Sequence, residues 1–199
     1  MAFDYPVFLD LTGLPVLVVG GGPVALRKAM GLSDAGASVT VVAPDVVAGI
    51  AEIAMVERRA YTTDDLTGMR LVVTATDDPA VNAKVASDAS AAGVFVNSAD
   101  DPENCSFILP AIARRGPITV AVSTGGVSPA LASRLRDEIA ANHLTAEVEA
   151  AAIDLGRQRA EIHAAGASTE DIDWSERIDA ALDSGGDAEC GRGPGNPRR

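Results

Sequence analysis

Aromatic residues, cysteines and long apolar runs are all scarce in this sequence. Only 4% of its 199 residues are aromatic although 47% are hydrophobic, so aliphatic side chains must supply most of a core. No apolar stretch approaches the roughly 20 residues that a membrane helix needs. We therefore expect a globular protein that does not cross a membrane, built as one domain with an appendage or as two small domains.

The chain has two cysteines, Cys105 and Cys190, which lie far apart in unlike surroundings. Such a pair makes neither a disulfide framework nor a metal motif, and with only two histidines present we expect no stable metal site. Residues 1–10 lack the basic start of a signal peptide. Together these absences favour a reducing cytoplasm.

Positive charge is also scarce. The sequence has 16 Lys and Arg against 28 Asp and Glu, which gives a formal net charge of −12. Lys28 and Lys84 are its only lysines. A nucleic-acid partner requires a basic face for its phosphates, so we expect none. An acidic, lysine-poor surface fits either a salt-rich cytoplasm or GC-rich coding, and the composition leaves both open.

Strands and helices alternate through the first half of the sequence. Short β-branched apolar runs are separated by segments rich in helix formers, and Gly36 and Gly93 end the two main helices. This order predicts an α/β fold with a Rossmann-type, doubly wound parallel sheet. The expected strands are Leu14–Gly20, Ser38–Ala43, Val56–Tyr61, Arg70–Thr76 and Val94–Ala99, and the expected helices are Pro23–Ala35 and Asp77–Ala92.

The pattern changes after Ala99. Two strand-like runs, Ser106–Arg114 and Ile118–Thr124, flank a turn signal and predict an antiparallel hairpin. Ser128 and Pro129 then open a helix, and a helical segment follows. We predict a Rossmann domain at 1–104, a hairpin–helix region at 105–144, a helical C-terminal segment at 145–184, and a disordered tail at 185–199. The family resemblance described below implies that 1–104 binds NAD and that 105–144 is a dimerisation and active-site region.

A glycine-rich turn lies between the first strand and the first helix. Residues 20–25 fit the pattern G-x-G-x-x-A, in which the first glycine permits a tight turn and the second a close approach to a pyrophosphate. The helix N-terminus would then hold the anion. A glycine turn without a ligand is the alternative. The predicted cofactor residues here are Gly20, Gly21, Gly22, Pro23 and Val24.

Two further segments are candidates for the cofactor. The acidic residue that holds the adenosine ribose should follow the second strand, where the sequence reads Ala43, Pro44, Asp45. No arginine follows closely to hold a 2′-phosphate, so the residues favour NAD over NADP. Thr76, at the end of a later strand, completes the predicted cofactor set.

Polar residues also follow the last parallel strand, beginning with Asn97 and continuing through Asp100 and Asp101. Carboxylates at this end of the sheet can act as a general base or as a metal site, and a plain Asp-Pro turn is an equal alternative on position alone. A second glycine turn at 123–129 could grip a carboxylate, although a hairpin exit with a helix cap is the simpler interpretation.

A series of motifs in order resembles the precorrin-2 dehydrogenase family, over about Pro6 to Ala140. The family includes stand-alone dehydrogenases, bifunctional dehydrogenase–ferrochelatases and the N-terminal module of fused sirohaem synthases. No methyltransferase module follows in this sequence, so we expect a form without one. The motifs are PVFLDL (6–11), VVGGGPVA (18–25) with Arg27 and Lys28, ATDD (75–78), Val96-Asn97 with Asp100, SFILPA (106–111) and AVSTGGVSP (121–129).

The resemblance implies NAD-dependent oxidation of precorrin-2 to sirohydrochlorin in sirohaem biosynthesis. It places the catalytic carboxylate on Asp100, and it implies a homodimer built by the hairpin and the next helix. Thr124 falls where some relatives carry a serine. Because precorrin-2 bears many carboxylates, nearby arginines are candidates for pairing with them. The predicted substrate-binding residues are Asn97, Ser123, Thr124, Gly125, Arg114 and Arg134.

Three alternatives stay open. A bifunctional enzyme would also insert iron, with the same Asp100 serving both reactions. A non-enzymatic NAD-sensing Rossmann module needs no positioned carboxylate, so Asp100 and the hairpin motif speak against it. A different small-molecule dehydrogenase could share the fold, because a fold alone does not choose a substrate.

Overall fold

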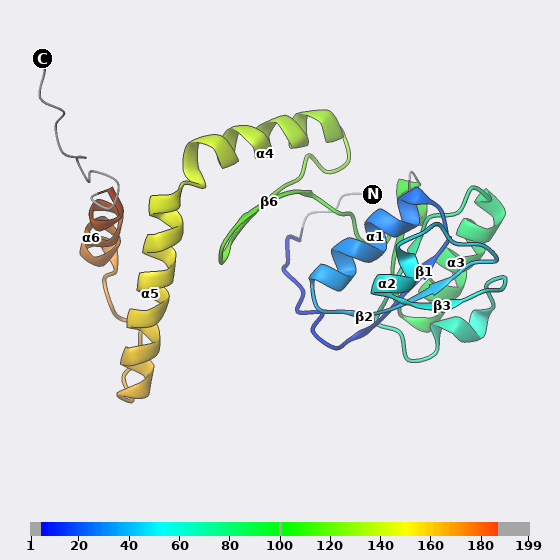
Figure 1. Ribbon diagram of the computed structural model, residues 1–199, viewed down its shortest axis with the longest axis horizontal. Helices are drawn as coiled ribbons and strands as arrows, with labels where there is room; N and C mark the ends of the chain where they lie inside the picture. Colours follow the sequence, from blue (N-terminus) through cyan, green and yellow to red (C-terminus); the bar gives the residue numbers. More distant parts are fainter. Residues whose placement is uncertain (1–4, 100, 187–199) are drawn as a thin grey trace, which may run out of the picture. The chain divides into compact units, whose positions relative to one another are not determined.

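A computed structural model describes residues 5–99 and 101–186 of the chain. These residues form two compact units, the first ending at Leu109 and the second beginning at Pro110. Figure 1 shows both units, which are described separately below. Within the described residues, every helix is too short or too polar to span a bilayer.

The first unit is built on a five-stranded sheet in the order β3-β2-β1-β4-β5, and every neighbouring pair is parallel. The strand order changes direction between β1 and β4, as it does in doubly wound sheets. This confirms the predicted Rossmann-type fold. The strands are β1 Pro15–Val19, β2 Ser38–Val42, β3 Met55–Glu57, β4 Leu71–Thr74 and β5 Phe95–Ser98. The helices are α1 Pro23–Asp34, α2 Ile50–Ile53, η1 Thr63–Leu66, α3 Pro79–Ala92 and η2 Pro102–Asn104.

Both faces of this sheet are buried, which explains why the strands read as continuous apolar runs. Successive side chains of a strand point to opposite faces, so Leu17 joins the cluster that contains Val85 of α3. Its neighbour Val18 joins the other cluster, with Ala25 and Ala29 of α1. The small alanines let α1 pack closely on the strands, as Figure 1 shows for the helix that lies over the sheet.

Helix α3 begins and ends where its sequence predicts. The Asp78 carboxylate accepts hydrogen bonds from the N–H groups of Ala80 (2.8 Å) and Val81 (3.4 Å), and Pro79 takes the first helical position. At the other end Gly93 adopts a left-handed φ of 69°. This cap and stop orient α3 against β4 and β5, the strands whose carboxyl ends carry Thr76 and Asn97.

The second unit contains the predicted antiparallel hairpin followed by three helices. Its elements are β6 Ala111–Arg115, β7 Ile118–Val122, α4 Pro129–His143, α5 Ala146–Ala164 and α6 Ser175–Gly186. The turn between β6 and β7 includes Gly116, with a φ of 50°. Helix α6 includes Gly185 and Gly186, the first residues of the predicted tail. Residues 187–199 lie outside the described residues.

The predicted strand Ser106–Arg114 is wrong in its first part, because β6 begins only at Ala111. Ser106 instead hydrogen-bonds to the edge strand β5: its hydroxyl accepts from the Val96 N–H at 2.7 Å, and its own N–H donates to the Val96 carbonyl at 2.8 Å. Ser106 therefore belongs to the rim of the parallel sheet. Pro110, which has no N–H to donate, separates this rim from the hairpin.

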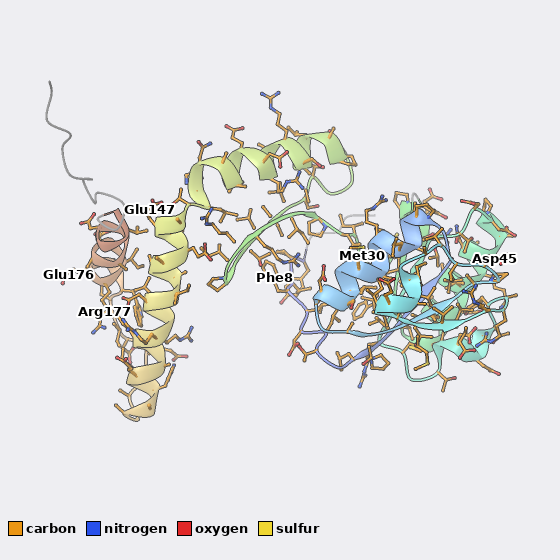
Figure 2. All side chains as sticks on the ribbon, in the orientation of Figure 1. Phe8, Met30, Asp45, Glu147, Glu176 and Arg177 are labelled. Carbon is orange, nitrogen blue, oxygen red and sulfur yellow. The ribbon has the colours of Figure 1, made fainter. Side chains whose placement is uncertain are left out.

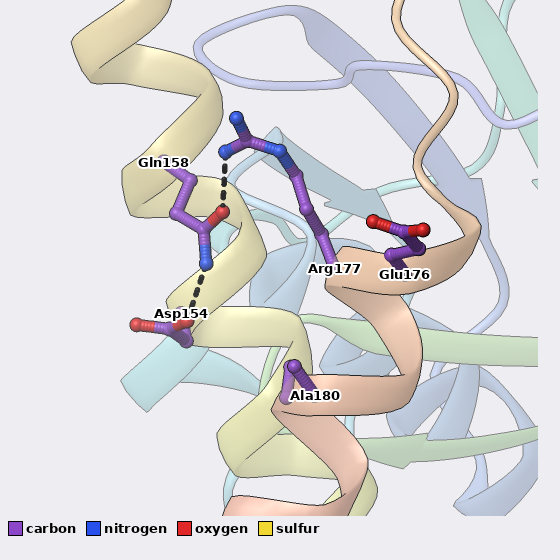
Figure 3. Close-up of a pocket in the computed structure, with 6 residues that line it drawn as sticks. Asp154, Gln158, Glu176, Arg177 and Ala180 are labelled. Atoms are coloured by element: carbon purple, nitrogen blue, oxygen red, sulfur yellow. Dashed lines mark hydrogen bonds between the residues drawn. The ribbon is translucent and has the colours of Figure 1, made fainter.

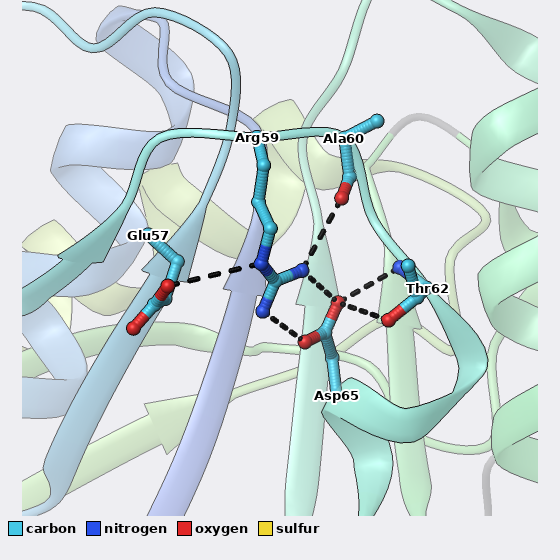
Figure 4. Close-up of polar contacts among 5 residues, drawn as sticks. All are labelled: Glu57, Arg59, Ala60, Thr62 and Asp65. Carbon is cyan, nitrogen blue, oxygen red and sulfur yellow. Dashed lines mark hydrogen bonds and ion pairs between the residues drawn. The ribbon is translucent and has the colours of Figure 1, made fainter.

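A polar contact links the end of β3 to η1 (Figure 4). The Arg59 guanidinium donates to both carboxylate oxygens of Asp65, at 2.9 and 2.6 Å, and the Thr62 N–H donates to the same carboxylate at 2.8 Å. The Asp65 side chain is only 8% exposed. The hydrogen bond from Arg59 is the main reason that the pKa of Asp65 lies below its ordinary value, although burial opposes it.

Replacing Asp65 by asparagine is expected to lower Tm at pH 7 by about 2–4 °C. A carboxyl with a lowered pKa in the folded state stabilises the fold above its ordinary pKa, and this contribution is lost as the pH falls through the folded-state value. The difference in Tm between the variant and the wild type should therefore shrink in acid. Thermal unfolding from pH 7 to pH 2 measures it. Asp64→Asn, on the same short helix but exposed, is the control that should change little.

Candidate functional site

Three segments meet at the carboxyl ends of β1, β2 and β4. At Gly20, whose φ is 127°, an added Cβ would lie 2.3 Å from the Ala75 carbonyl oxygen. At Gly21, an added Cβ would lie 1.8 Å from the carbonyl oxygen of Asp45. The Val47 N–H also donates to the Gly21 carbonyl at 2.8 Å. The glycine turn, the loop after β2 and the end of β4 are thus brought together, as their positions in the sequence predict.

Gly22 differs from the two glycines before it. Its φ is −82°, which any residue can adopt, and apart from its chain neighbours no atom of the described residues lies within 4 Å of an added Cβ. It is the N-cap of α1, and it supplies no side-chain cap to the first N–H groups of that helix. Such N–H groups and the positive end of the helix dipole attract an anion. The turn therefore presents an open, uncapped helix N-terminus that fits a pyrophosphate.

The other predicted cofactor residues surround this turn in different ways. Pro23 and Val24 are exposed at the start of α1, and Ala43 is buried at the end of β2. Pro44 and Asp45 are exposed, and Figure 2 shows Asp45 at the rim of the first unit. The Asp45 carboxylate is therefore accessible to a ligand, while its backbone carbonyl packs against Gly21.

Thr76 is placed beside the glycine turn, but its side chain serves the local fold. Its hydroxyl donates to the Asn82 Oδ1 at 2.8 Å and accepts from the Asp78 N–H at 3.2 Å. The Asn82 amide in turn donates to the Thr76 carbonyl at 3.0 Å. These bonds close the turn between β4 and α3, so the hydroxyl is occupied within the protein.

Asp100, the predicted catalytic residue, lies outside the described residues. Both neighbours of Asp100 make backbone hydrogen bonds. The Ala99 N–H donates to the Thr74 carbonyl at 3.0 Å, and the Asp101 N–H donates to the Ser98 carbonyl at 3.4 Å. The Asp101 carboxylate accepts from the Asn104 side-chain amide at 2.6 Å. Of the adjacent pair of aspartates, Asp101 is thus engaged in the turn that follows β5.

Asn97 is buried at the end of β5, with 5% of its surface exposed. Its side-chain amide donates to the Phe107 carbonyl at 3.0 Å, which holds the chain after the aspartates against the edge of the sheet. The same amide lies 3.7 Å from the Cys105 Sγ. The Asn97 Oδ1 is buried and has no hydrogen-bond partner among the described residues, so it is the polar atom of this side chain left for the predicted role toward a substrate.

Cys105 packs beneath the same loop. Burial is the main reason that the pKa of its thiol is raised, so the group stays protonated at neutral pH. In the described part of the chain, no cluster of three or more His, Cys, Asp or Glu residues could hold a metal ion. A protonated, buried thiol is a hydrogen-bonding group rather than a ligand.

In the second unit, the hydroxyls predicted to meet the substrate hydrogen-bond inside their own turn. The Thr124 hydroxyl donates to the Ser128 carbonyl and accepts from the Ser128 N–H, both at 3.0 Å. The Ser123 hydroxyl accepts from the Gly125 N–H at 3.1 Å. Gly125 and Gly126 have φ values of 61° and 86°, which explains both glycines as parts of a tight turn.

The arginines of the hairpin and α4 differ in how they are engaged. Arg115 pairs with Glu149 at 2.9 Å and donates to the Leu144 carbonyl at 3.3 Å. Arg136 pairs with Asp137 at 2.7 Å. Arg114 and Arg134 are exposed and make no ion pair within the described residues. These two remain available for a carboxylate ligand.

A polar hollow on the surface of α5 and α6 contains none of the predicted site residues (Figure 3). Gln158 bridges its charged groups: its amide donates to Asp154 at 2.7 Å, and its carbonyl oxygen accepts from Arg177 at 2.8 Å. Because these side chains satisfy one another, the hollow is not a candidate for the chemistry.

Comparison with known proteins assigns the chain to a family. Residues 7–111 match the family described as putative NAD(P)-binding, and residues 115–142 match the sirohaem biosynthesis protein central family. The solved structure of SirC, a precorrin-2 dehydrogenase, is 32% identical with a TM-score of 0.68, over 90% of this chain and 88% of that one. This chain belongs to the precorrin-2 dehydrogenase and sirohaem synthase family.

Curated members of the family give closer sequence matches over a shorter region. The siroheme synthase of Ectopseudomonas mendocina is 50% identical over 137 residues, and that of Methylococcus capsulatus is 51% identical over 142 residues. These alignments cover 67% and 68% of this chain but only 30% of each relative. The chain therefore spans about a third of the length of these relatives. The match to the NAD(P)-binding family contains every predicted cofactor segment.

The sequence did not predict two backbone groups that shape the glycine turn in this family member. The Ala75 carbonyl packs against Gly20, and the Val47 N–H binds the Gly21 carbonyl. Neither contact involves a side chain, so no residue type signals it. The second could be suspected only from the length of the loop after β2, which must return over the glycines.

Proposed function

We propose that this protein is an NAD-dependent precorrin-2 dehydrogenase, which oxidises precorrin-2 to sirohydrochlorin in sirohaem biosynthesis. The observation that carries the proposal is the open, uncapped N-terminus of α1 behind Gly22, in a family that includes a structurally similar precorrin-2 dehydrogenase. Both the pyrophosphate site and the segment with the predicted carboxylate follow the carboxyl ends of strands in one parallel sheet. We place the reaction in the cytoplasm, where thiols such as Cys105 stay reduced.

In this proposal, different residues serve different parts of the reaction. A bound NAD⁺ supplies the acceptor for a hydride from a reduced carbon of the macrocycle. Asp100 accepts the proton that leaves the same substrate. The hydride carries both electrons to NAD⁺, and the hydride and the proton together account for the two hydrogens that the substrate loses. Gly22 and the N-terminus of α1 hold the pyrophosphate, and the tight turn at Gly20 and Gly21 keeps that helix end beside β2 and β4.

Arg114 and Arg134 bind carboxylates of the tetrapyrrole in this proposal. Both are exposed and free of ion pairs within the described residues, in a protein whose net charge is −12. Without such local cations, a substrate with many carboxylates would be repelled. Ser123, Thr124 and Gly125 then contribute the shape of a rigid turn, because their polar groups are largely used within it.

We also propose a homodimer formed through the hairpin and α4. A two-stranded sheet is marginally stable by itself, and β6 and β7 form such a sheet. Leu131 and Leu135 on α4 are 48% and 38% exposed, and Val127 before it is 89% exposed. A second copy of the chain would cover these side chains. Sedimentation measurements across protein concentrations test this state.

We propose NAD rather than NADP as the cofactor, with Asp45 as the partner of the adenosine ribose. Asp45→Ala is expected to raise the Kd for NAD⁺ about 5- to 10-fold, which corresponds to one lost hydrogen bond. The Kd for NADP⁺ should fall or stay unchanged, because a carboxylate repels a 2′-phosphate. Fluorescence titration of both nucleotides measures the ratio. A variant that loses affinity for both equally would remove Asp45 from the ribose site.

An anaerobic absorbance assay tests the proposed function. Purified protein is given enzymatically generated precorrin-2 with NAD⁺, with NADP⁺ or with no nucleotide. The spectrum of sirohydrochlorin should appear with NAD⁺ and not without a nucleotide. A further arm with sirohydrochlorin and Fe²⁺ reports whether the same protein also inserts iron. If NAD⁺ binds but no product forms, a sensor module or a dehydrogenase for another substrate takes the place of this proposal.

A further inference from the structure

We infer that Cys105 is a positioning residue, which holds the chain against the end of β5 at Ser98 and Asp101, on either side of residues 99 and 100 in the loop that follows this strand. The sequence of this loop includes Asp100, so the inference rests on the proposed function in giving that carboxylate its role. The thiol itself takes no part in the chemistry. It determines where the loop is held.

The contacts of the sulfur carry this inference. The Cys105 Sγ accepts a hydrogen bond from the Ser98 N–H at 3.1 Å. The Sγ lies 3.3 Å from the carbonyl oxygens of both Ser98 and Asp101, to which its S–H can donate. One buried side chain therefore binds the backbone immediately before and immediately after residues 99 and 100. No other side chain in the described residues makes hydrogen bonds to the backbone on both sides of this pair.

The loop is anchored to the sheet at both of its ends as well. Before it, the Ser98 hydroxyl accepts from the Thr74 hydroxyl at 3.0 Å, which ties β5 to β4. After it, Ser106 bonds to Val96, and the Asn97 amide donates to the Phe107 carbonyl. With the two ends held by β5, the sulfur at one end of the loop joins Ser98 at the other end to Asp101. We call this set of contacts around Cys105 the loop clasp.

The chemistry of a thiol suits this position. Cys105 is 6% exposed, so water cannot easily replace it as a hydrogen-bond partner of the nearby backbone. Leaving the Ser98 N–H without a partner there would lower the stability of the fold. A protonated thiol can accept from the Ser98 N–H while offering its own hydrogen to a carbonyl. A serine hydroxyl offers the same donor and acceptor at slightly shorter reach, whereas an alanine methyl offers neither. The two substitutions therefore separate hydrogen bonding from side-chain volume.

The experiment compares Cys105→Ser with Cys105→Ala in the full chain. Cys105→Ala is expected to lower kcat for precorrin-2 oxidation about 10- to 100-fold, because an error of about 1 Å in the position of a catalytic group can cost this much. Cys105→Ser should stay within about threefold of the wild type. The KM for NAD⁺ should be unchanged in both variants, since no hydrogen bond among the described residues joins the glycine turn at 20–22 to the clasp.

Hydrogen–deuterium exchange provides a readout that does not depend on activity. In Cys105→Ala the amides of residues 98–106 should exchange about tenfold faster, while those of β1 and α1 keep their wild-type rates. Cys105→Ser should preserve the slow exchange of this segment. A purely packing role predicts equal loss in both variants.

Each outcome decides the inference. It is overturned if Cys105→Ala keeps both the wild-type kcat and slow exchange at 98–106, or if serine and alanine lose the same amount. If the wild type binds NAD⁺ but does not oxidise precorrin-2, the proposed function fails, while the exchange data still show whether the clasp exists. If the wild type is active and only Cys105→Ala is impaired, with its loop loosened, both proposals stand.

Discussion

Asp100→Asn is expected to lower the rate of precorrin-2 oxidation by about 100- to 10,000-fold, the range of a lost general base. An asparagine amide has nearly the size of the carboxylate but cannot accept the proton that the substrate must release. Affinity for NAD⁺ should be unchanged, because the pyrophosphate site that we propose at the N-terminus of α1 uses no group of this loop. Stopped-flow absorbance under anaerobic conditions, with a separate nucleotide titration, measures both quantities.

The adjacent aspartate is a matched control for this substitution. Asp101 accepts from the Asn104 side chain at 2.6 Å, so its carboxylate is already engaged in the turn. Asp101→Asn should reduce the rate by less than about tenfold, as a change in loop geometry rather than in chemistry. If Asp101→Asn instead abolishes turnover and Asp100→Asn does not, the base has been assigned to the wrong member of the pair.

Much of the fold could be predicted because its signals are local. The β-branched runs, the glycine stops and the Asp78-Pro79 start each specify an element without reference to distant residues, and those elements appear. Ser106 shows where this fails. Its segment looks like a strand, but it is bound to Val96 of an edge strand through its hydroxyl, a tertiary contact that no local pattern contains.

The candidate site follows the same division. Topology alone brings the ends of β1, β2 and β4 together, so the grouping of Gly20, Ala43 and Thr76 could be predicted. The hydrogen bonds of individual hydroxyls could not be predicted. Thr76 and Thr124 occupy turns in which a hydroxyl can hydrogen-bond either to a ligand or to the backbone of the turn. Both hydroxyls accept a hydrogen bond from a backbone N–H of their own turn. The contacts of Cys105 were equally hard to predict, since three of them are to backbone groups.

Gly22→Ala is expected to separate cofactor binding from folding. In the part of the chain that the structure describes, only the neighbouring residues come within 4 Å of the added Cβ, and the φ of −82° suits alanine. The apo variant should therefore fold with a Tm close to that of the wild type. The methyl group would instead occupy the space in which we propose that the pyrophosphate binds the first N–H groups of α1. Losing one hydrogen bond to a charged group, about 1.5–3 kcal/mol, corresponds to a Kd for NAD⁺ raised about 10- to 150-fold.

Two glycines of the same region give controls of opposite kinds. Gly31→Ala, within α1 and also clear of protein atoms, should stabilise the helix by up to about 1 kcal/mol and leave NAD⁺ affinity unchanged. Gly21→Ala forces a Cβ to within 1.8 Å of the Asp45 carbonyl oxygen, so it should destabilise the apo protein by at least about 1–3 kcal/mol. Calorimetry of NAD⁺ binding and thermal unfolding of the apo proteins distinguish the three. A Gly22→Ala variant that binds NAD⁺ like the wild type would show that the cofactor does not approach the protein at this turn.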